Sequence, residues 1–127
     1  MTFIKIESWT VKEGTKQDHD RVIQKWFSLV RKNHLRFFSE WKSVRYYRFL
    51  DSEAKPTGRY LMYYEFFSRE GYQTYKEKRE KGEIPQEKLE ELDLHQLFFI
   101  EKIAEKYLEP VEEKIWFDFS SKSKSID

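Results

Sequence analysis

The spacing of apolar residues changes along this chain between that of strands and that of helices. The order of these segments limits the possible folds more than any other feature. Four segments alternate apolar and polar or aromatic residues as strands do, namely residues 2–11, 44–50, 59–67 and 115–119. Helical spacing separates the first strand from the second and the third from the fourth. The order strand, helix, strand, strand, helices, strand is that of a ferredoxin-like α+β sandwich with a four-stranded antiparallel sheet. We therefore predict one domain over residues 1–119, with a mobile tail over residues 120–127.

The first helix is expected to follow Gly14. Thr15 and Asp18 have the spacing of a capping box, in which two side chains bind free amides at a helix start. The helix stripe runs through Val22, Trp26, Val30 and Phe37. One face of this helix is therefore predicted to be buried against the sheet.

The helical region between the third and fourth strands is predicted to be split. Ser68 is suited to cap a short helix that Gly82 ends, and Pro85 is suited to the first turn of a second helix. That second helix is predicted to end near Leu108, before Pro110. Its apolar face would carry Leu89, Leu92, Phe99, Ile103 and Tyr107.

Composition excludes several classes of partner and chemistry. Lys and Arg total 24 and Asp and Glu 23, so the net charge of +1 gives no field that attracts nucleic acid or an anionic membrane. The chain has no cysteine, which excludes disulfides and thiolate chemistry. No apolar signal or spanning segment follows Met1, so we expect a cytoplasmic protein. Charged residues make up 37% of the chain, a composition typical of thermophile surfaces.

Both faces of the predicted sheet carry apolar or aromatic residues. In the third strand Tyr60, Met62 and Tyr64 lie on one parity, and Leu61 and Tyr63 lie on the other. A sheet covered by helices on one side normally has a polar second face. An apolar second face predicts burial against another copy of the chain, and we therefore expect a homodimer packed sheet to sheet.

One local motif and the order of elements resemble a known group. The run from Trp9 to Gly14 (Trp-Thr-Val-Lys-Glu-Gly) is similar to a strand-end turn of the dimeric α/β-barrel superfamily, with Glu13 where proline is usual. Within that superfamily the chain resembles the antibiotic-biosynthesis-monooxygenase-like and NIPSNAP-like groups. The resemblance implies a ligand cavity between helices and sheet. The helical region between Ser68 and Pro110 is longer than the resemblance implies.

Two histidines lie on predicted helix stripes. His34 shares a face with Val30 and Phe37, and an imidazole in the implied cavity can act as a general base. The alternative is a histidine that binds backbone or solvent. His95 shares a face with Leu92 and would line the same cavity. His19 lies between two aspartates and is expected to be exposed. No metal-ligand spacing is present, so we expect no metal and no cofactor.

A carboxylate inside the third strand is the second candidate group. Glu65 has aromatic neighbours, and Arg45 and Arg48 lie on opposite parities of the second strand, so one arginine shares its face. We expect a cross-strand ion pair, which is either structural or part of a site that moves a proton. The walls of that site would include Tyr46, Tyr47, Tyr63 and Tyr64. The full set of predicted pocket residues is Trp26, Arg48, Tyr46, Tyr64 and His95, around the catalytic candidates His34 and Glu65.

These observations favour a homodimeric barrel that binds a small apolar or aromatic molecule between helices and sheet. If it is an enzyme, the resemblance suggests a cofactor-independent monooxygenase, and an isomerase is the other possibility. The alternative function is a non-catalytic dimer whose aromatic residues form only core and interface. Phosphate-binding glycine loops, serine-hydrolase elbows and dinucleotide fingerprints are absent from the sequence.

Overall fold

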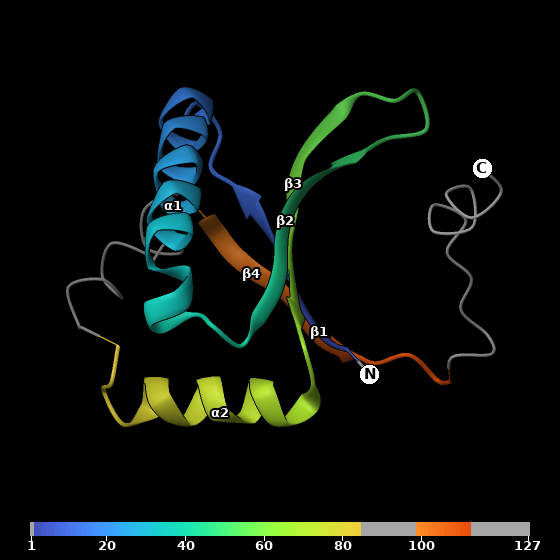
Figure 1. Ribbon diagram of the computed structural model, residues 1–127. Coiled ribbons are helices and arrows are strands. Elements are labelled where there is room, and N and C mark those ends of the chain that lie inside the picture. The colour runs from blue at the N-terminus through green and yellow to red at the C-terminus, as the bar shows by residue number, and fades with distance from the viewer. Residues whose placement is uncertain (1, 85–98, 113–127) are drawn as a thin grey trace, which may run out of the picture.

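Four strands form one antiparallel sheet with two helices on the same side of it (Figure 1). The computed structural model describes residues 2–84 and 99–112. The elements in these ranges are β1 (Phe3–Val11), α1 (Lys16–Phe37), β2 (Trp41–Leu50), β3 (Pro56–Phe66), α2 (Arg69–Glu80) and β4 (Phe99–Leu108). The predicted α+β ferredoxin-like class is confirmed.

The strands are ordered β2-β3-β1-β4, with β1 and β3 in the centre. β1 pairs antiparallel with β3 on one side, where Ile6 faces Tyr63, and with β4 on the other, where Lys5 faces Tyr107. We call the side of the sheet that faces the helices the inner face and the opposite side the outer face. Because side chains alternate along a strand, Phe3, Lys5, Glu7 and Trp9 of β1 share the inner face.

The core lies between α1, α2 and the inner face. Its buried aromatic residues are Trp9, Trp26, Phe37, Phe38, Trp41 and Phe66. Met62 fills the centre of the sheet and is fully buried. The rings pack at angles, as in the edge-to-face contact of Trp41 with Tyr64 at 5.2 Å between centroids. Tyr72 and Tyr75 of α2 pack against this core. The helix itself lies below α1 in Figure 1.

The two predicted helix caps had different outcomes. Ser68 caps α2 as predicted, since its hydroxyl accepts a hydrogen bond from the amide of Gly71 at 2.9 Å. The capping box of Thr15 is wrong, because its hydroxyl instead donates to the carbonyl of Lys12 at 2.6 Å and makes no cap hydrogen bond to α1. The loop that enters α1 therefore uses this hydroxyl for its own turn.

Residues 99–108 form strand β4, so the prediction that they continue a helix is wrong. The three- and four-residue apolar spacing is helical, but the free edge of β1 needs a strand to bind its amides and carbonyls. Irregularities between Ser8 and Trp9 and between Thr10 and Val11 shift the β1–β4 register. A bulge adds one residue to a strand, so apolar residues that are not two positions apart can still lie on the same face of it. The predicted helix start at Pro85 and the predicted strand over residues 115–119 lie outside the described residues.

Candidate functional site

The residues predicted from the sequence to form a site are divided between three places. His34, in the last turns of α1, donates from Nε2 to the carbonyl oxygen of Trp41 at 2.9 Å and so ties the helix to the start of β2. Trp26 lies in the buried core against Trp41. Glu65 lies on the outer face. His95 lies outside the described residues.

Glu65 has a different partner from the one expected. Arg45 shares its outer face, as one arginine was predicted to do, while Arg48 lies opposite Tyr60 on the inner side. The carboxylate accepts a hydrogen bond from the Ser43 hydroxyl at 3.0 Å. The expected ion pair with an arginine is not formed within the part of the chain that the structure describes. The tyrosines expected to line one pocket also separate, since Tyr46 and Tyr64 face the helices whereas Tyr47 and Tyr63 face outward.

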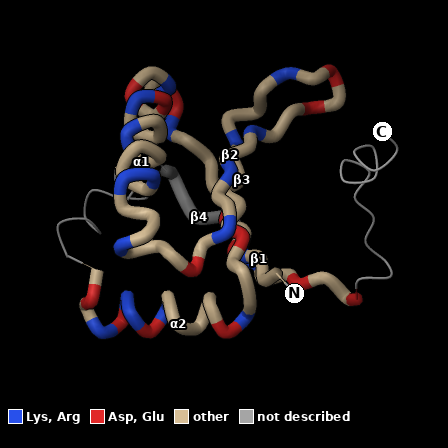
Figure 2. Tube along the Cα trace, in the orientation of Figure 1, with Lys and Arg blue, Asp and Glu red and all other residues tan. Residues whose placement is uncertain are grey.

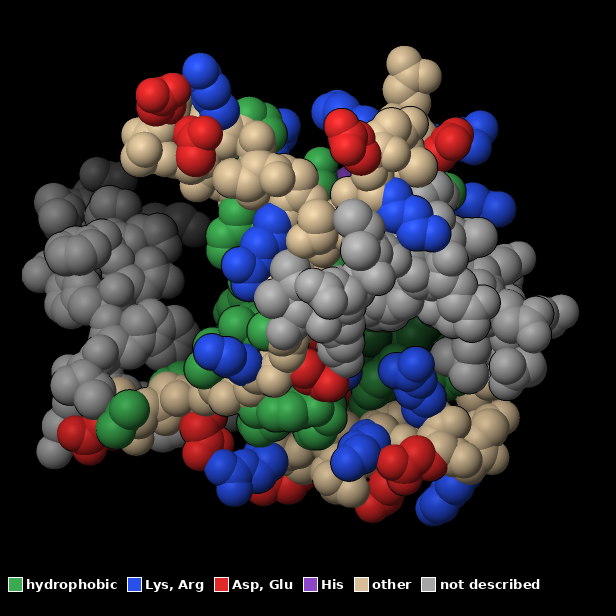
Figure 3. Space-filling model, turned by 180° about the vertical axis from the view of Figure 1, so that it is seen from behind, with side chains coloured by type: hydrophobic (Ala, Val, Ile, Leu, Met, Phe, Trp, Pro, Cys, Tyr) green, Lys and Arg blue, Asp and Glu red, His purple; other side chains and the backbone are tan. Residues whose placement is uncertain are grey.

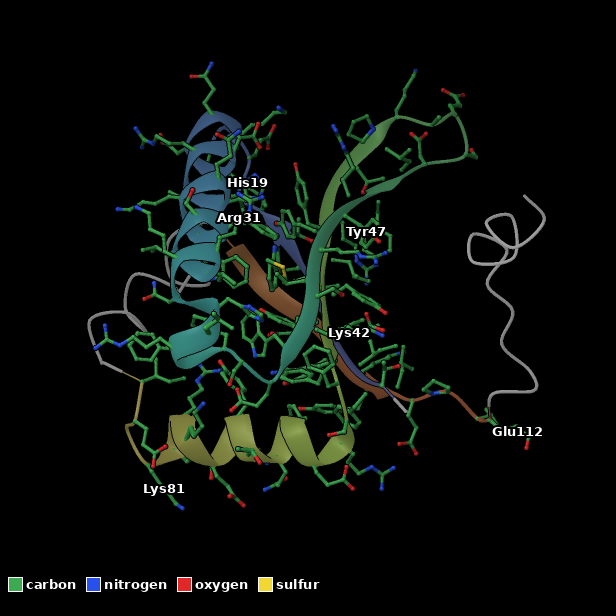
Figure 4. The ribbon with its side chains drawn as sticks, viewed as in Figure 1. His19, Arg31, Lys42, Tyr47, Lys81 and Glu112 are labelled. Carbon is green, nitrogen blue, oxygen red and sulfur yellow. The ribbon has the colours of Figure 1, made fainter. Side chains whose placement is uncertain are left out.

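A buried histidine that the sequence analysis placed on the surface forms a hydrogen-bonded chain with residues of α1, β1 and β2. His19 is only 2% exposed and points from the first turn of α1 toward the sheet (Figure 4). Its Nδ1 lies 3.0 Å from the Asp20 carboxylate and its Nε2 lies 2.9 Å from the Tyr46 hydroxyl. The indole N–H of Trp9 donates to the same hydroxyl at 2.9 Å. We call these four residues, Trp9, Tyr46, His19 and Asp20, the histidine relay.

The partners of the histidine relay define where its protons lie. The Asp20 carboxylate only accepts, so Nδ1 of His19 carries the proton and Nε2 accepts from the Tyr46 hydroxyl. Burial lowers the pKa of His19, although Asp20 acts to raise it. The net lowering keeps the ring neutral near pH 7. Burial also raises the pKa of Tyr46. The relay is thus a chain of hydrogen bonds that joins α1 to β1 and β2. The raised pKa of Tyr46 and the lowered pKa of His19 both keep the proton on the tyrosine oxygen.

A second polar group lies further along the inner face of β1. The ammonium of Lys5 lies 3.0 Å from the carboxylate of Glu105 and 3.7 Å from that of Glu7. The Glu7 side chain is only 9% exposed, and the Lys5 side chain 17%. Burial raises the pKa of Tyr64 well above its usual value, and the negative charge of Glu7 adds to the shift. We call Lys5, Glu7, Tyr64 and Glu105 the inner-face ion cluster.

The relay and the cluster occupy one stripe of the central strand. Lys5, Glu7 and Trp9 are alternate residues of β1, so neighbouring members are about 7 Å apart. Core-facing positions of a central strand are normally apolar, and a buried charge is costly unless it is paired. The stripe therefore places the hydrogen-bonded relay beside a paired ammonium and carboxylate in a largely aromatic layer.

The sequence contains a signal that His19 is buried, although the prediction from its neighbours is an exposed side chain. The two flanking aspartates suggested solvent, yet His19 lies three residues before Val22 and so continues the stripe that leads to Trp26. Asp20 takes the solvent side, where Lys16 binds its other oxygen at 3.0 Å. No comparable signal marked Glu7, because a strand that looked apolar on both faces gave no reason to choose it.

Comparison with known proteins supports the fold alone. The sequence matches no protein-family model, and no curated protein matches it significantly. Among solved structures, a candidate antibiotic biosynthesis monooxygenase from Bordetella bronchiseptica superposes with a TM-score of 0.56 at 16% identity, covering 87% of this chain and 98% of that one. A NIPSNAP family protein of unknown function from Agrobacterium tumefaciens gives 0.55 at 19% identity, over 86% and 87%. An uncharacterized NIPSNAP-like domain protein from Burkholderia xenovorans gives 0.58 at 10% identity, over 88% and 87%.

The chain therefore has the ferredoxin-like fold that these monooxygenase-like and NIPSNAP proteins share, as the sequence resemblance implied. None of the helices in residues 2–84 and 99–112 is both long and apolar enough to cross a bilayer.

Proposed function

We propose that the protein is a homodimer in which each subunit binds a small, largely apolar or aromatic molecule between its helices and the inner face. The observation that carries this proposal is the inner-face ion cluster. A buried carboxylate and ammonium on a central strand stabilise a fold poorly, so their presence there favours a role in binding. The aromatic residues around them, Tyr64 and Trp9 among them, suit an apolar ligand with one polar group.

In an enzymatic version of this function, Glu7 is the group that we assign as general base. Its carboxylate takes a proton from the bound molecule, and the ammonium of Lys5 stabilises the anion that remains. An isomerase would return the proton to a different atom of that anion. A cofactor-independent oxygenase would let the anion react with molecular oxygen. This proposal moves the base from His34 and Glu65 to Glu7, because His34 is bound to backbone and Glu65 lies on the outer face.

The homodimer is proposed on the composition of the outer face. Tyr47 and Leu108 are each 48% exposed there, and Phe49 is 36% exposed. Figure 3 shows hydrophobic side chains on the side of the sheet away from α1, with Lys and Arg among them. A soluble monomer rarely leaves such a face in water, and a second copy is the partner that the chain itself provides.

A non-catalytic dimer is the second candidate function, and the histidine relay favours it. Both ring nitrogens of His19 are bound within the chain, as is Nε2 of His34. A histidine satisfied in this way can serve only to fix α1 on the sheet.

Binding and thermal stability distinguish the two functions. We expect a screen of small aromatic acids and phenols to yield compounds that raise the melting temperature of the wild-type protein. Their affinity should fall at least about tenfold in Glu7→Gln, because a charged hydrogen-bonding partner is lost. Glu53→Gln, in the exposed turn between β2 and β3, is the matched control and should bind normally. Compounds that bind Glu7→Gln as tightly as the wild type would contradict the assigned role of Glu7.

A further inference from the structure

The histidine relay places a base at the hydroxyl of a tyrosine. The Tyr46 hydroxyl donates to Nε2 of His19 at 2.9 Å, and Nδ1 of the same ring donates to the Asp20 carboxylate at 3.0 Å. The first of these distances is within the reach of direct proton transfer. While Tyr46 is reduced, its proton stays on the tyrosine oxygen, and the relay serves to fix α1 on the sheet. Loss of one electron from the phenol ring reverses that balance, because an oxidised phenol is a far stronger acid than an imidazolium.

Aromatic rings lie against Tyr46 and provide a path for an electron. The ring centroid of Trp9 is 6.0 Å from that of Tyr46, and the Trp9 indole donates a hydrogen bond to the Tyr46 hydroxyl. Tyr60 stacks on Tyr46 with 5.2 Å between centroids and only 6° between the ring planes. Electron transfer between rings in contact needs no further carrier. Trp9 also follows Glu7 on the inner face of β1, so an oxidised group beside the inner-face ion cluster is one ring away from Tyr46.

We propose that Tyr46 is a redox-active tyrosine, which a radical derived from molecular oxygen oxidises to a neutral phenoxyl radical while His19 takes the phenolic proton. The oxidant gains the one electron that leaves the Tyr46 ring, either directly or through Trp9. The O–H bond of Tyr46 breaks and an N–H bond forms at Nε2 of His19. Tyr46 therefore stays uncharged, and the imidazole becomes an imidazolium. The site draws oxidation away from the buried core, and it does so whether or not the protein binds the small molecule proposed above.

The positive charge that forms on His19 lies beside a carboxylate. Asp20 accepts from Nδ1, and a hydrogen bond between an imidazolium and a carboxylate is stronger than one between neutral groups. Lys16 binds the other oxygen of Asp20 at 3.0 Å and holds this carboxylate in place, although its own charge opposes that of an imidazolium. Figure 2 shows acidic and basic positions close together at this end of α1. Trp9 and His19 are almost fully buried, which shields the radical oxygen from water.

The neighbouring tyrosine of β2 has no such base and provides the comparison. Tyr47 faces outward and is 48% exposed. Its hydroxyl meets the guanidinium of Arg45, and a guanidinium has no site that accepts a proton. A radical formed at Tyr47 would lose its proton to water and would be open to reaction there. The two tyrosines therefore predict radicals of different lifetime.

Flash photolysis of the protein with tris(bipyridine)ruthenium and persulfate tests this difference by transient absorption. We expect the wild type to form a tyrosyl radical that decays about tenfold more slowly than the radicals of Tyr46→Phe. His19→Gln keeps an acceptor for the Tyr46 hydroxyl but removes the base, so the yield of the long-lived radical should fall about tenfold. Tyr47→Phe is the matched control and should behave as the wild type. A wild type without a long-lived radical, or a radical that persists unchanged in Tyr46→Phe or His19→Gln, would overturn the proposal.

A second measurement uses the wild-type protein alone and so decides the question even if circular dichroism shows a variant to be unfolded. The radical is trapped by freezing after illumination, and electron–nuclear double resonance records the nuclei coupled to it. We expect one strongly coupled proton that disappears in heavy water, because the imidazolium of His19 donates back to the phenoxyl oxygen. Isotopically labelled histidine should add a nitrogen coupling. A tyrosyl radical with neither coupling would show that His19 does not hold the proton, and would refute the proposal.

Discussion

Replacing Tyr46 by phenylalanine removes the single hydroxyl that joins α1, β1 and β2. That hydroxyl donates to Nε2 of His19 and accepts from the indole of Trp9, at 2.9 Å in each case. Both neighbours are almost fully buried, at 2% and 1% exposure, so water cannot replace the lost partner without opening the core. A buried polar group left without its partner costs about 1–3 kcal/mol.

Because two such groups are affected, Tyr46→Phe should lower the free energy of unfolding by about 2–4 kcal/mol. That is a large part of the roughly 5–15 kcal/mol by which a typical domain is stable. Urea unfolding, monitored by tryptophan fluorescence, measures the change. The matched control is Tyr47→Phe, the same substitution one residue later on the outer face, where the side chain is 48% exposed. An exposed change of this kind alters the free energy of unfolding by about 0.5 kcal/mol or less.

The difference between the two variants decides whether the histidine relay stabilises the fold. If Tyr46→Phe loses no more stability than Tyr47→Phe, the hydrogen bonds of the relay contribute nothing measurable and the assignment is refuted. A loss that is large in both variants would point instead to a general effect of removing tyrosine hydroxyls from β2.

Three further predictions concern single features of the fold. Burial puts the pKa of His19 below its value in the unfolded chain. The free energy of unfolding should therefore be constant above about pH 6.5 and should fall at lower pH, by up to about 1.4 kcal/mol per pH unit, until the folded pKa is reached. Urea titrations should show this slope in the wild type and not in His19→Gln. Ser68→Ala should cost about 1 kcal/mol in urea unfolding, because the hydroxyl that caps α2 is lost, and an unchanged midpoint would contradict the cap. Met62→Ala should cost about 2–5 kcal/mol in thermal or urea unfolding, since the side chain is fully buried, and a loss below 1 kcal/mol would mean that the core closes over the gap.

Local patterns were sufficient to predict most of the fold. The alternation of Tyr60 with Leu61 and the helical spacing from Val22 to Val30 have no competing interpretation, so β3 and α1 were placed close to their observed bounds. Residues 99–108 were assigned wrongly, because their apolar spacing is helical and only the free edge of β1, a tertiary feature, makes them a strand.

The site was harder to predict than the fold because it depends on which residues meet across elements. Parity predicted that one arginine would share the face of Glu65, but not that Ser43 would supply its hydrogen bond. The aspartate neighbours of His19 predict an exposed side chain, whereas its contact with Tyr46 joins residues 27 positions apart. Sequence spacing describes one element at a time, and hydrogen bonds between elements follow only from their packing.

The two histidines of α1 each bind β2, one near either end of the helix. His19 reaches Tyr46, and His34 reaches the carbonyl of Trp41. Within residues 2–84 and 99–112, β2 is an edge strand with only β3 beside it. We therefore expect these ties to make the helix and the strand unfold locally as one unit. Amides of α1 and β2 should therefore become open to hydrogen exchange together, and fraying of the sheet edge is limited by the stability of a helix that lies in another layer.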